Sequence, residues 1–397
     1  MVTQRGHIPD DAKACGSADP SPQPTAPADP FRQAGYCTRE SVRQPIFADP
    51  VRLGGHAVGR GRRAVVIAEA GVNHNGDLDT ALAMVASAAQ AGADFVKFQA
   101  FRAGALVSRH APPADYQKRA TGAETQQCLL ASLELDRNAF VALRRQCDAM
   151  GIGFLATPFS PDDLDMLVGL GVDAVKMAST DLDNWPLLDA CAATRLPLIL
   201  STGAAMAEEL DATVQRLGHV HHVAQLVLLH CVSAYPATRA RMNLRRIATL
   251  ADRYGALTGF SDHTTATDAG GLAVAAGACV LEKHFTLDRT RPGPDQAASL
   301  EPDELAAYIR GVRDVELCLG DGELSMQACE TDVRRAARKS VVAGCDIQPG
   351  ETVRADMLAI KRAGEGISPR HLGEIVGAVA TRTIRADQPI ECNMLRR

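Results

Sequence analysis

Residues 64–100 read AVVIAEAGVNHNGDLDTALAMVASAAQAGADFVKFQA and set the pattern for most of the chain. Two apolar runs, AVVIAEA (64–70) and ADFVKFQ (93–99), have the length of buried strands. Between them Asp77 is a suitable N-cap, TALAMVASAAQA has a helical composition, and Gly92 can end a helix. The stretch therefore predicts a β-strand, an α-helix and a second β-strand in that order.

The same alternation continues to about residue 320. Strand-sized runs follow at GFLATPF (153–159), DAVKMAS (173–179), PLILSTG (197–203), QLVLLHC (225–231), ALTGFSD (256–262) and CVLEKHF (279–285). Helices are expected at 161–169, 186–194, 205–217, 243–254, 266–277 and 302–319. Alternation implies parallel pairing, and eight units over roughly 250 residues match a (β/α)₈ TIM barrel. An open doubly wound sheet is the alternative, but NHNGD (73–77) is not its glycine-rich phosphate loop.

Composition divides the chain into four regions. Residues 1–45 mix prolines with Ala, Asp, Ser and Gln, which predicts a disordered extension. Residues 46–320 hold the barrel, whose long connection at 100–135 is expected to cover or shape the active site. Residues 321–337 are polar and predict a linker. The short β-type runs of residues 338–397 predict a small β-rich domain of about 60 residues, docked on its own barrel or on a partner's.

Charge and composition exclude several classes of protein. Lys and Arg total 42 against 47 acidic residues, a net charge of −5, whereas nucleic-acid binding needs a concentrated basic surface. The longest apolar stretches are strand-sized, and no N-terminal run resembles a secretion signal, so we expect no membrane span. The 11 cysteines contain no C-x-x-C pair, which favours reduced thiols in the cytoplasm over disulfides or structural zinc.

Most strand-sized runs end on a side chain that can do chemistry. The carboxyl ends of all strands in a parallel barrel meet at one face, so these side chains predict one crowded polar site and therefore an enzyme. The residues at or just beyond these ends are Glu69, Lys97, Gln99, Thr157, Lys176, Ser179, Ser201, Ser261, Asp262, His263, Glu282 and His284.

Two histidines follow neighbouring strands of the predicted barrel. His263 and His284 can lie at one rim, and two imidazoles with a carboxylate or water suit a divalent metal of the Mn, Mg or Zn type. The alternative is a pair of core or hydrogen-bonded histidines. Glu69 also stands out, because an unpaired carboxylate is costly inside an apolar strand. Asp262, Glu282 and Asp295 are further acid, base or hydroxyl-binding candidates.

Two lysines at strand ends predict an anion site. A semi-buried lysine needs an anion to compensate its charge, so Lys97 and Lys176 with nearby hydroxyls form a phosphate or carboxylate cradle. The hydroxyls are those of Thr157, Ser179, Ser201 and Ser261. One lysine could instead be a Schiff-base nucleophile, and ordinary salt bridges are the plain structural alternative.

Ten strings in order resemble the sialic acid synthase family, over both predicted domains. They are IAEAGVNHNGD (67–77), VKFQAF (96–101), TPFS (157–160), VKMASTD (175–181), LSTG (200–203), HCVSAYP (230–236), GFSDHT (259–264), LEKHFT (281–286), PGPDQAASLEP (292–302) and IKRAGEGISP (360–369). The last domain is similar to the family's antifreeze-like, SAF-type β-clip module. The resemblance implies condensation of phosphoenolpyruvate with an N-acylated hexosamine such as N-acetylmannosamine, with C–O cleavage and phosphate release.

The resemblance also implies roles for individual residues. His263 and His284 would bind the metal, Mn²⁺ or Mg²⁺. Phosphoenolpyruvate would be held by Lys97, Thr157, Lys176, Ser179, Ser201 and Ser261. The sugar would meet Glu69, Asp295 and Tyr235, with Gln99, Asp181 and Ser233 as further substrate contacts. Catalysis would involve Glu69, Lys97, Lys176, Asp262 and Glu282. Arg362 would reach the neighbouring subunit's site in a domain-swapped homodimer.

Four residues depart from the family pattern and leave the identity of the sugar open. Thr180 and Asp181 stand where Gly-Glu is frequent, Ser233 where Asn is common, and Gln296 where His or Ile is common. Pseudaminic, legionaminic and spore-coat polysaccharide synthases share the framework, and phosphorylation of the sugar at carbon 6 is undecided. A pyruvate aldolase that uses Lys176 as a Schiff base is a second enzyme class. A sugar-binding or assembly protein without catalysis is a third reading.

Overall fold

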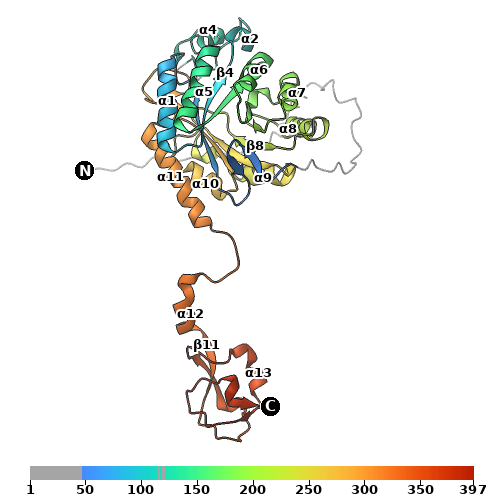
Figure 1. Cartoon of the computed structure of the whole chain (residues 1–397), viewed down its shortest axis with the longest axis vertical. Coiled ribbons are helices and arrows are strands. Elements are labelled where there is room, and N and C mark those ends of the chain that lie inside the picture. Colours follow the sequence, from blue (N-terminus) through green and yellow to red (C-terminus); the bar gives the residue numbers. More distant parts are fainter. Residues whose placement is uncertain (1–46, 115–116, 119–120) are drawn as a thin grey trace, which may run out of the picture.

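The computed structural model describes residues 47–114, 117–118 and 121–397 (Figure 1). The predicted disordered extension at 1–45 lies outside the described residues. The described part forms a barrel, an extended connection and a small C-terminal domain.

Eight parallel strands confirm the predicted barrel. Hydrogen bonds join them in the order β5-β4-β3-β10-β9-β8-β7-β6, so β5 and β6 are the two edges of a nearly closed sheet. The strands are β3 (Val65–Gly71), β4 (Phe95–Ala100), β5 (Gly153–Pro158), β6 (Val175–Met177), β7 (Leu198–Ser201), β8 (Leu226–Cys231), β9 (Leu257–Asp262) and β10 (Val280–His284).

Helices surround this sheet and begin where local caps predict. Asp77 accepts a hydrogen bond from Thr80 N at the start of α1, and Gly92 ends that helix with φ at 88°. The main helices are α1 (Leu78–Ala91), α5 (Arg137–Met150), α6 (Pro161–Gly169), α7 (Trp185–Ala193), α8 (Ala207–Gln215), α9 (Arg245–Tyr254), α10 (Ala269–Ala275) and α11 (Pro302–Leu319). The sequence pattern did not indicate α5, although Asp136 and Gly151 cap it in the same way.

Side-chain alternation along the strands divides the core into two layers. One layer packs between strands and helices and includes Val66, Val96 and Phe154. The other fills the lower barrel and includes Ile67 and Leu155. The inward-facing side chains of this second layer therefore form a floor beneath the residues at the carboxyl ends of the same strands.

A short hairpin closes the amino-terminal end of the barrel. It consists of β1 (Val51–Leu53) and β2 (His56–Val58), and its buried side chains Val51, Leu53 and Val58 join the inner core. Because this end is plugged, the accessible site lies at the carboxyl ends of the strands.

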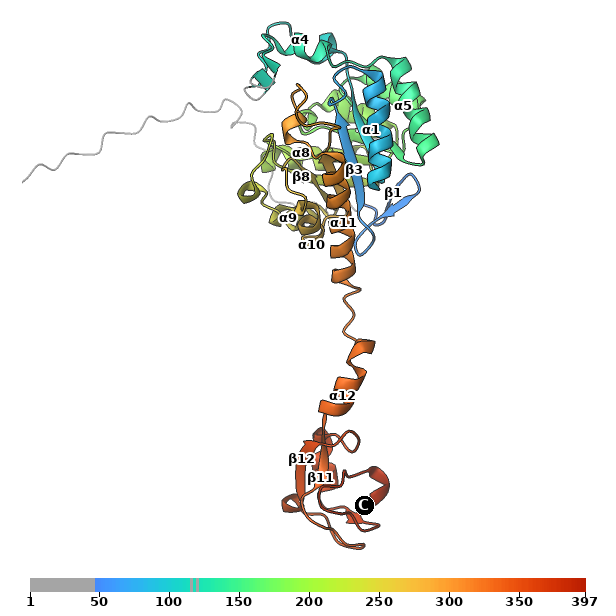
Figure 2. The ribbon, with the colours of Figure 1, turned by 90° about the vertical axis from the view of Figure 1, so that its left-hand side faces the viewer.

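The C-terminal domain stands clear of the barrel in both ribbon views (Figures 1 and 2). It contains two small antiparallel sheets, β11 (Lys339–Ala343) with β12 (Leu358–Arg362), and β13 (Val379–Ala380) with β14 (Leu395–Arg396). A short helix, α13 (Leu372–Ile375), packs with them. The predicted linker at 321–337 contains another helix, α12 (Thr331–Ala337). Within the described residues, no helix is both long and apolar enough to cross a membrane.

Candidate active site

A cavity of about 360 Å³ opens at the carboxyl ends of the strands. Most of the side chains predicted from the strand ends and from the family resemblance line it. These are Glu69, Lys97, Gln99, Thr157, Lys176, Ser179, Ser201, Tyr235, Ser261, His263, Glu282, His284 and Asp295.

The strand register brings these groups together from distant parts of the chain. Glu69 pairs with His284 on one side and with Lys97 on the other, while Gln99 pairs with Thr157. Gly71, with φ at 53°, gives the Glu69 carboxylate its space, because a Cβ there would lie 3.2 Å from Oε1.

Lys97 is buried among oxygen atoms. Its Nζ lies 2.7 Å from Glu69 Oε2 and 3.7 Å from Glu282 Oε2, and it donates to Thr157 Oγ1 at 3.1 Å. Burial alone lowers the pKa of Lys97, but the two carboxylates outweigh it and the pKa is raised. Lys97 therefore remains a cation at neutral pH.

Lys176 approaches the same carboxylate from the other side. Its Nζ lies 3.8 Å from Glu282 Oε2 and donates to Ser201 Oγ at 2.8 Å and to Met177 O at 2.9 Å. Burial lowers the pKa of Lys176. The pKa of Glu282 is lowered, because Lys176 and Lys97 together outweigh the effect of its burial. Two ammonium groups that converge on one point suit an anion with more than one charged group.

Two other carboxyl groups hold protons more readily. Burial raises the pKa of Glu69, against the effect of Lys97, and Gln99 Nε2 donates to Glu69 Oε1 at 3.2 Å. Burial, assisted by the charge of Glu69, raises the pKa of Asp295 to about 7. Asp295 can therefore exchange a proton near neutral pH, which general acid–base catalysis requires, and Glu69 is a stronger base than a solvent-exposed glutamate.

The two histidines meet at the rim of the cavity. Their ring centroids are 5.4 Å apart, and Tyr235 stacks on His263 at 4.3 Å. His263 Nδ1 lies 2.7 Å from Val232 O, which fixes the proton on Nδ1 and leaves the Nε2 lone pair for a ligand. Burial lowers the pKa of both imidazoles, His284 most strongly, so both are neutral at pH 7.

This pair fits a divalent cation only with outside ligands. His284 Nδ1 is buried, has no hydrogen-bond partner and lies 3.8 Å from Asp295 Oδ2. Among the described residues, no cluster of three or more His, Cys, Asp or Glu side chains is arranged to hold a metal. The protein would therefore supply two imidazole nitrogens, and water or substrate oxygens would complete the coordination.

The structure places four predicted residues outside the cavity. Asp262, predicted to be catalytic, does not line the cavity, because it is buried in the barrel wall and pairs with Lys283. Asp181 accepts a hydrogen bond from Asn184 Nδ2 next to α7 and does not line the cavity. Ser233 lies close to Gly203 but is exposed. Arg362 is exposed on β12.

The long connection at 100–135 supplies part of the cavity wall, as its length suggested. It includes α2 (Ala103–Leu106) and α4 (Gln126–Ala131), which lie together at the top of the barrel (Figure 1). The lining residues from this region are Leu106, Val107, Gln117, Gln126, Leu129, Leu130 and Leu133. Sequence reasoning also missed Cys231, although its place at the end of QLVLLHC was a usable signal.

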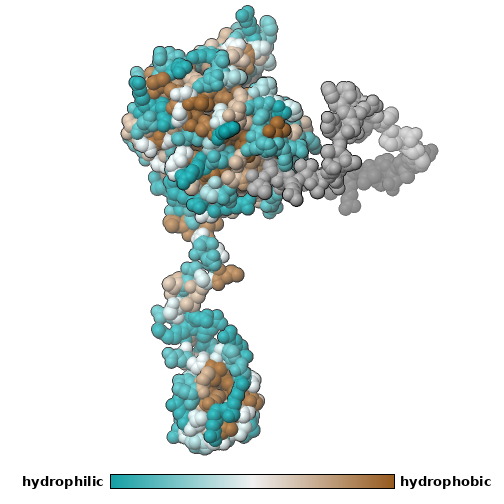
Figure 3. Space-filling view, turned by 45° about the vertical axis from the view of Figure 1, so that its right-hand side comes forward, coloured by the Kyte–Doolittle hydropathy of each residue, from teal (hydrophilic) through white to brown (hydrophobic). Residues whose placement is uncertain are grey.

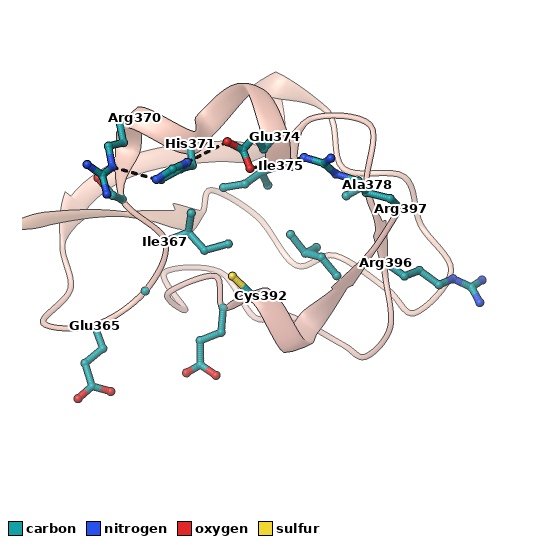
Figure 4. A pocket seen from close by; sticks show the side chains of 14 residues that line it. Glu365, Ile367, Arg370, His371, Glu374, Ile375, Ala378, Cys392, Arg396 and Arg397 are labelled. Carbon is teal, nitrogen blue, oxygen red and sulfur yellow. Dashed lines mark hydrogen bonds and ion pairs between the residues drawn. The ribbon is translucent and has the colours of Figure 1, made fainter.

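A second cavity, of about 690 Å³, lies in the C-terminal domain (Figure 4). Along one side Arg370 Nε donates to His371 Nε2 at 2.9 Å, and His371 Nδ1 lies 2.9 Å from Glu374 Oε1. These side chains satisfy one another, and the lining mixes positive and negative charges. The arrangement does not converge on a ligand in the way that the barrel cavity does.

Comparisons with known proteins agree with this architecture. The model of the NeuB family matches residues 84–324, and that of the SAF domain matches residues 338–396. The chain is 39% identical to N,N'-diacetyllegionaminic acid synthase of Legionella pneumophila over 325 residues, 81% of this chain and 91% of that protein. It is 34% identical to human N-acetylneuraminate-9-phosphate synthase over 339 residues, 85% of this chain and 94% of that protein.

A solved structure gives the same result. The N-acetylneuraminic acid (sialic acid) synthetase of Leptospira borgpetersenii, in complex with citrate, superposes with a TM-score of 0.65 at 36% identity, over 72% of this chain and 96% of that chain. Fold and site together define a barrel enzyme of the sialic acid synthase type with a C-terminal SAF domain. The chain belongs to the NeuB family.

Proposed function

We propose that this enzyme joins phosphoenolpyruvate to the open-chain aldehyde of an N-acylated hexosamine and releases phosphate. The observation that carries the proposal is the convergence of Lys97 and Lys176 on Glu282 beside two neutral histidines. The lysines, with Thr157, Ser179, Ser201 and Ser261, would hold the phosphate and carboxylate of phosphoenolpyruvate. Such preorganised cations stabilise charge throughout a reaction without reorganising.

The charges of the cavity favour an additional cation in the complex. Lys97 and Lys176 are matched by Glu69 and Glu282, so a bound phosphoenolpyruvate would add uncompensated negative charge. His263 and His284 would hold Mn²⁺ or Mg²⁺. Such a cation, when bound, supplies Lewis-acid polarisation of the aldehyde oxygen.

The remaining side chains account for the protons. Carbon 3 of phosphoenolpyruvate attacks the aldehyde carbon, and Asp295, with a pKa of about 7, can give the new hydroxyl its proton. Water adds at carbon 2 and passes a proton to Glu69. The carbon 2–oxygen bond to phosphate then breaks, the carbon 2 hydroxyl becomes a carbonyl by giving up its proton, and inorganic phosphate leaves with that proton.

The sugar is best sought among unphosphorylated N-acyl hexosamines. The described lining of the cavity within one subunit holds no lysine beyond Lys97 and Lys176 and no arginine, so that subunit offers no further cation for a 6-phosphate. We expect N-acetylmannosamine or a 2,4-diacetamido relative to release phosphate from phosphoenolpyruvate, and N-acetylmannosamine 6-phosphate to react poorly. Mass analysis of products from this panel tests the proposal. Absence of sugar-dependent phosphate release with every member would contradict it.

A Schiff-base aldolase is a second candidate, favoured by one observation. Burial lowers the pKa of Lys176, as an amine nucleophile requires. Borohydride trapping with pyruvate separates the two functions, because only the aldolase forms a covalent adduct. We expect no adduct, since Lys176 Nζ already donates to Ser201 Oγ and lies beside the Glu282 carboxylate, whose charge favours the ammonium form.

We also propose that the working unit is a domain-swapped homodimer in which Arg362 enters the partner's cavity. Arg362 is exposed on a domain that stands clear of its own barrel (Figure 2). The connecting segment exposes Leu324, Met326 and Val333, and Figure 3 shows hydrophobic surface along it. Apolar side chains on an extended connection need a cover, which a second copy would supply. The free thiols of the described cysteines support a reducing, cytoplasmic location.

A further inference from the structure

Asp262 and Lys283 form an ion pair in the wall of the barrel, behind the cavity. Lys283 Nζ lies 3.0 Å from Asp262 Oδ2, and both side chains are 0% exposed. Burying two charges is costly, and apolar side chains of similar volume are often at least as stabilising. Stability alone therefore does not explain why the wall contains this pair.

Lys283 holds the backbone on both sides of His263. Its ammonium donates to the carbonyl oxygen of Thr264 and lies 3.5 Å from the carbonyl oxygen of Asp262. The Asp262 carboxylate in turn accepts from Thr264 N at 2.8 Å. Lys283, which directly precedes His284, thus holds the backbone on both sides of His263.

The strand register makes this tie specific. Lys283 on β10 pairs with Asp262 on β9 in the parallel ladder. Since side chains alternate across a strand, their neighbours on either side face the cavity. These neighbours are Ser261 and Glu282, joined by a hydrogen bond of 3.1 Å, and His263 and His284.

Tyr308 of α11 packs beside Lys283 on the helix side of the barrel wall. Its ring centroid lies 5.7 Å from Lys283 Nζ, and the side chain is fully buried. The ring packs so closely on Gly270 of α10 that a Cβ there would lie 2.4 Å from it. Two helices therefore confine the ammonium group against the strand ends.

We infer that Asp262 and Lys283 are positioning residues, which fix the placement of His263 relative to His284 and thereby set the affinity of this pair for a divalent cation. The inference rests on the proposed function, which assigns a metal to the two imidazoles. Supporting residues behind metal ligands typically change metal affinity by about 10–100-fold when they are lost.

Manganese titration of the metal-free full-length protein, followed by the electron paramagnetic resonance of free Mn²⁺, tests the inference without substrate or turnover. The variant is Asp262→Leu/Lys283→Met, which replaces both charges by apolar groups and keeps the wall filled. We expect a melting temperature near that of the wild type and an affinity for Mn²⁺ at least about 10-fold weaker. The matched control is Asp189→Leu/Arg216→Met, an ion pair of 2.5 Å on the outside of the barrel, which should bind Mn²⁺ like the wild type.

The outcomes separate the two claims. If the wild type binds no Mn²⁺, the metal assignment and this inference both fall. If the wild type binds and the folded double variant binds within twofold, the inference is overturned and the proposed function stands. Where the double variant does not fold, Asp262→Asn replaces it, because the amide keeps an acceptor for Thr264 N but repels the ammonium. A several-fold loss of affinity in Asp262→Asn supports the inference, and unchanged affinity overturns it.

Discussion

Individual charges decide what the barrel cavity can bind. Glu282 sits between Lys176 and Lys97, and each ammonium group also contacts a hydroxyl that can be shared with a ligand. Removing any one of these charges leaves another buried without compensation, which is costly in a low-dielectric site. The cavity is therefore most sensitive to substitutions that change charge rather than shape.

Replacing Lys176 with Met tests the anion cradle. The variant keeps the side-chain length but loses one of the two ammonium groups, so kcat/KM for phosphoenolpyruvate should fall about 10²–10³-fold. Steady-state phosphate release measures the effect. Arg144→Met, which removes a cation from the surface of α5, is the control and should leave kcat/KM unchanged. Equal activity of Lys176→Met and the wild type would contradict the cradle.

Asp295 makes stability depend on pH with a definite sign. Its folded pKa is about 7 against an ordinary value of 3.8, so between these values the folded state keeps a proton that the unfolded chain has released. Stability therefore falls as the pH rises from about 4 to 7. Asp295→Asn cannot ionise, so its free energy of unfolding should lack this pH dependence. Relative to the wild type, we expect that free energy to rise by up to about 4 kcal/mol between pH 4 and pH 7. Urea titrations of the metal-free protein at several pH values measure this difference. If the free energies of unfolding of the variant and the wild type changed in parallel with pH, the prediction would be refuted.

At the scale of elements, the two ends of the barrel have separate tasks. The β1–β2 hairpin fills the amino-terminal end with side chains such as Val51 and Leu53, while catalytic-type groups occupy the other end. Stability and chemistry are therefore separable along the strands, as is usual for barrels of this kind.

Leu53→Ala tests this separation. The side chain is fully buried, so its truncation should cost about 2–5 kcal/mol in the free energy of unfolding. Because the hairpin lies opposite the cavity, kcat/KM at low temperature should stay close to the wild-type value. Arg52→Ala, on the exposed face of the same strand, is the control and should change neither quantity. A large fall in kcat/KM for Leu53→Ala would contradict the separation.

At the scale of the whole molecule, the position of the C-terminal domain makes a prediction about subunit mixing. Arg362→Ala and His263→Ala should each be nearly inactive alone. If Arg362 acts across the dimer, a mixed dimer has one complete site. The Arg362→Ala subunit supplies an intact barrel, and the His263→Ala subunit supplies an intact Arg362. Re-assembly of equal amounts should then restore activity in about a quarter of all sites, because half of the dimers are mixed and each has one complete site. Phosphate release before and after mixing measures it, and an inactive mixture would show that Arg362 does not act in trans.

Local sequence was enough to predict many elements but not all. The caps of α1, at Asp77 and Gly92, are local signals and fixed its ends correctly. The sequence pattern did not predict α5, because its sequence, RNAFVALRRQCDAM, has only a narrow apolar stripe. That stripe includes Phe140 and Leu143 and lies among charged residues. Its burial depends on packing against α1 rather than on its own composition.

The sequence by itself determined the alternation of strands and helices, the polar strand ends and the resemblance to a family, because these depend on neighbouring residues. Only the tertiary structure decided which polar residues meet. Ser261 and His263 face the cavity while Asp262 between them faces the helices, and Lys97 and Lys176 share one carboxylate. The reason is that barrel closure and strand register bring distant segments together, and no local pattern encodes that distance.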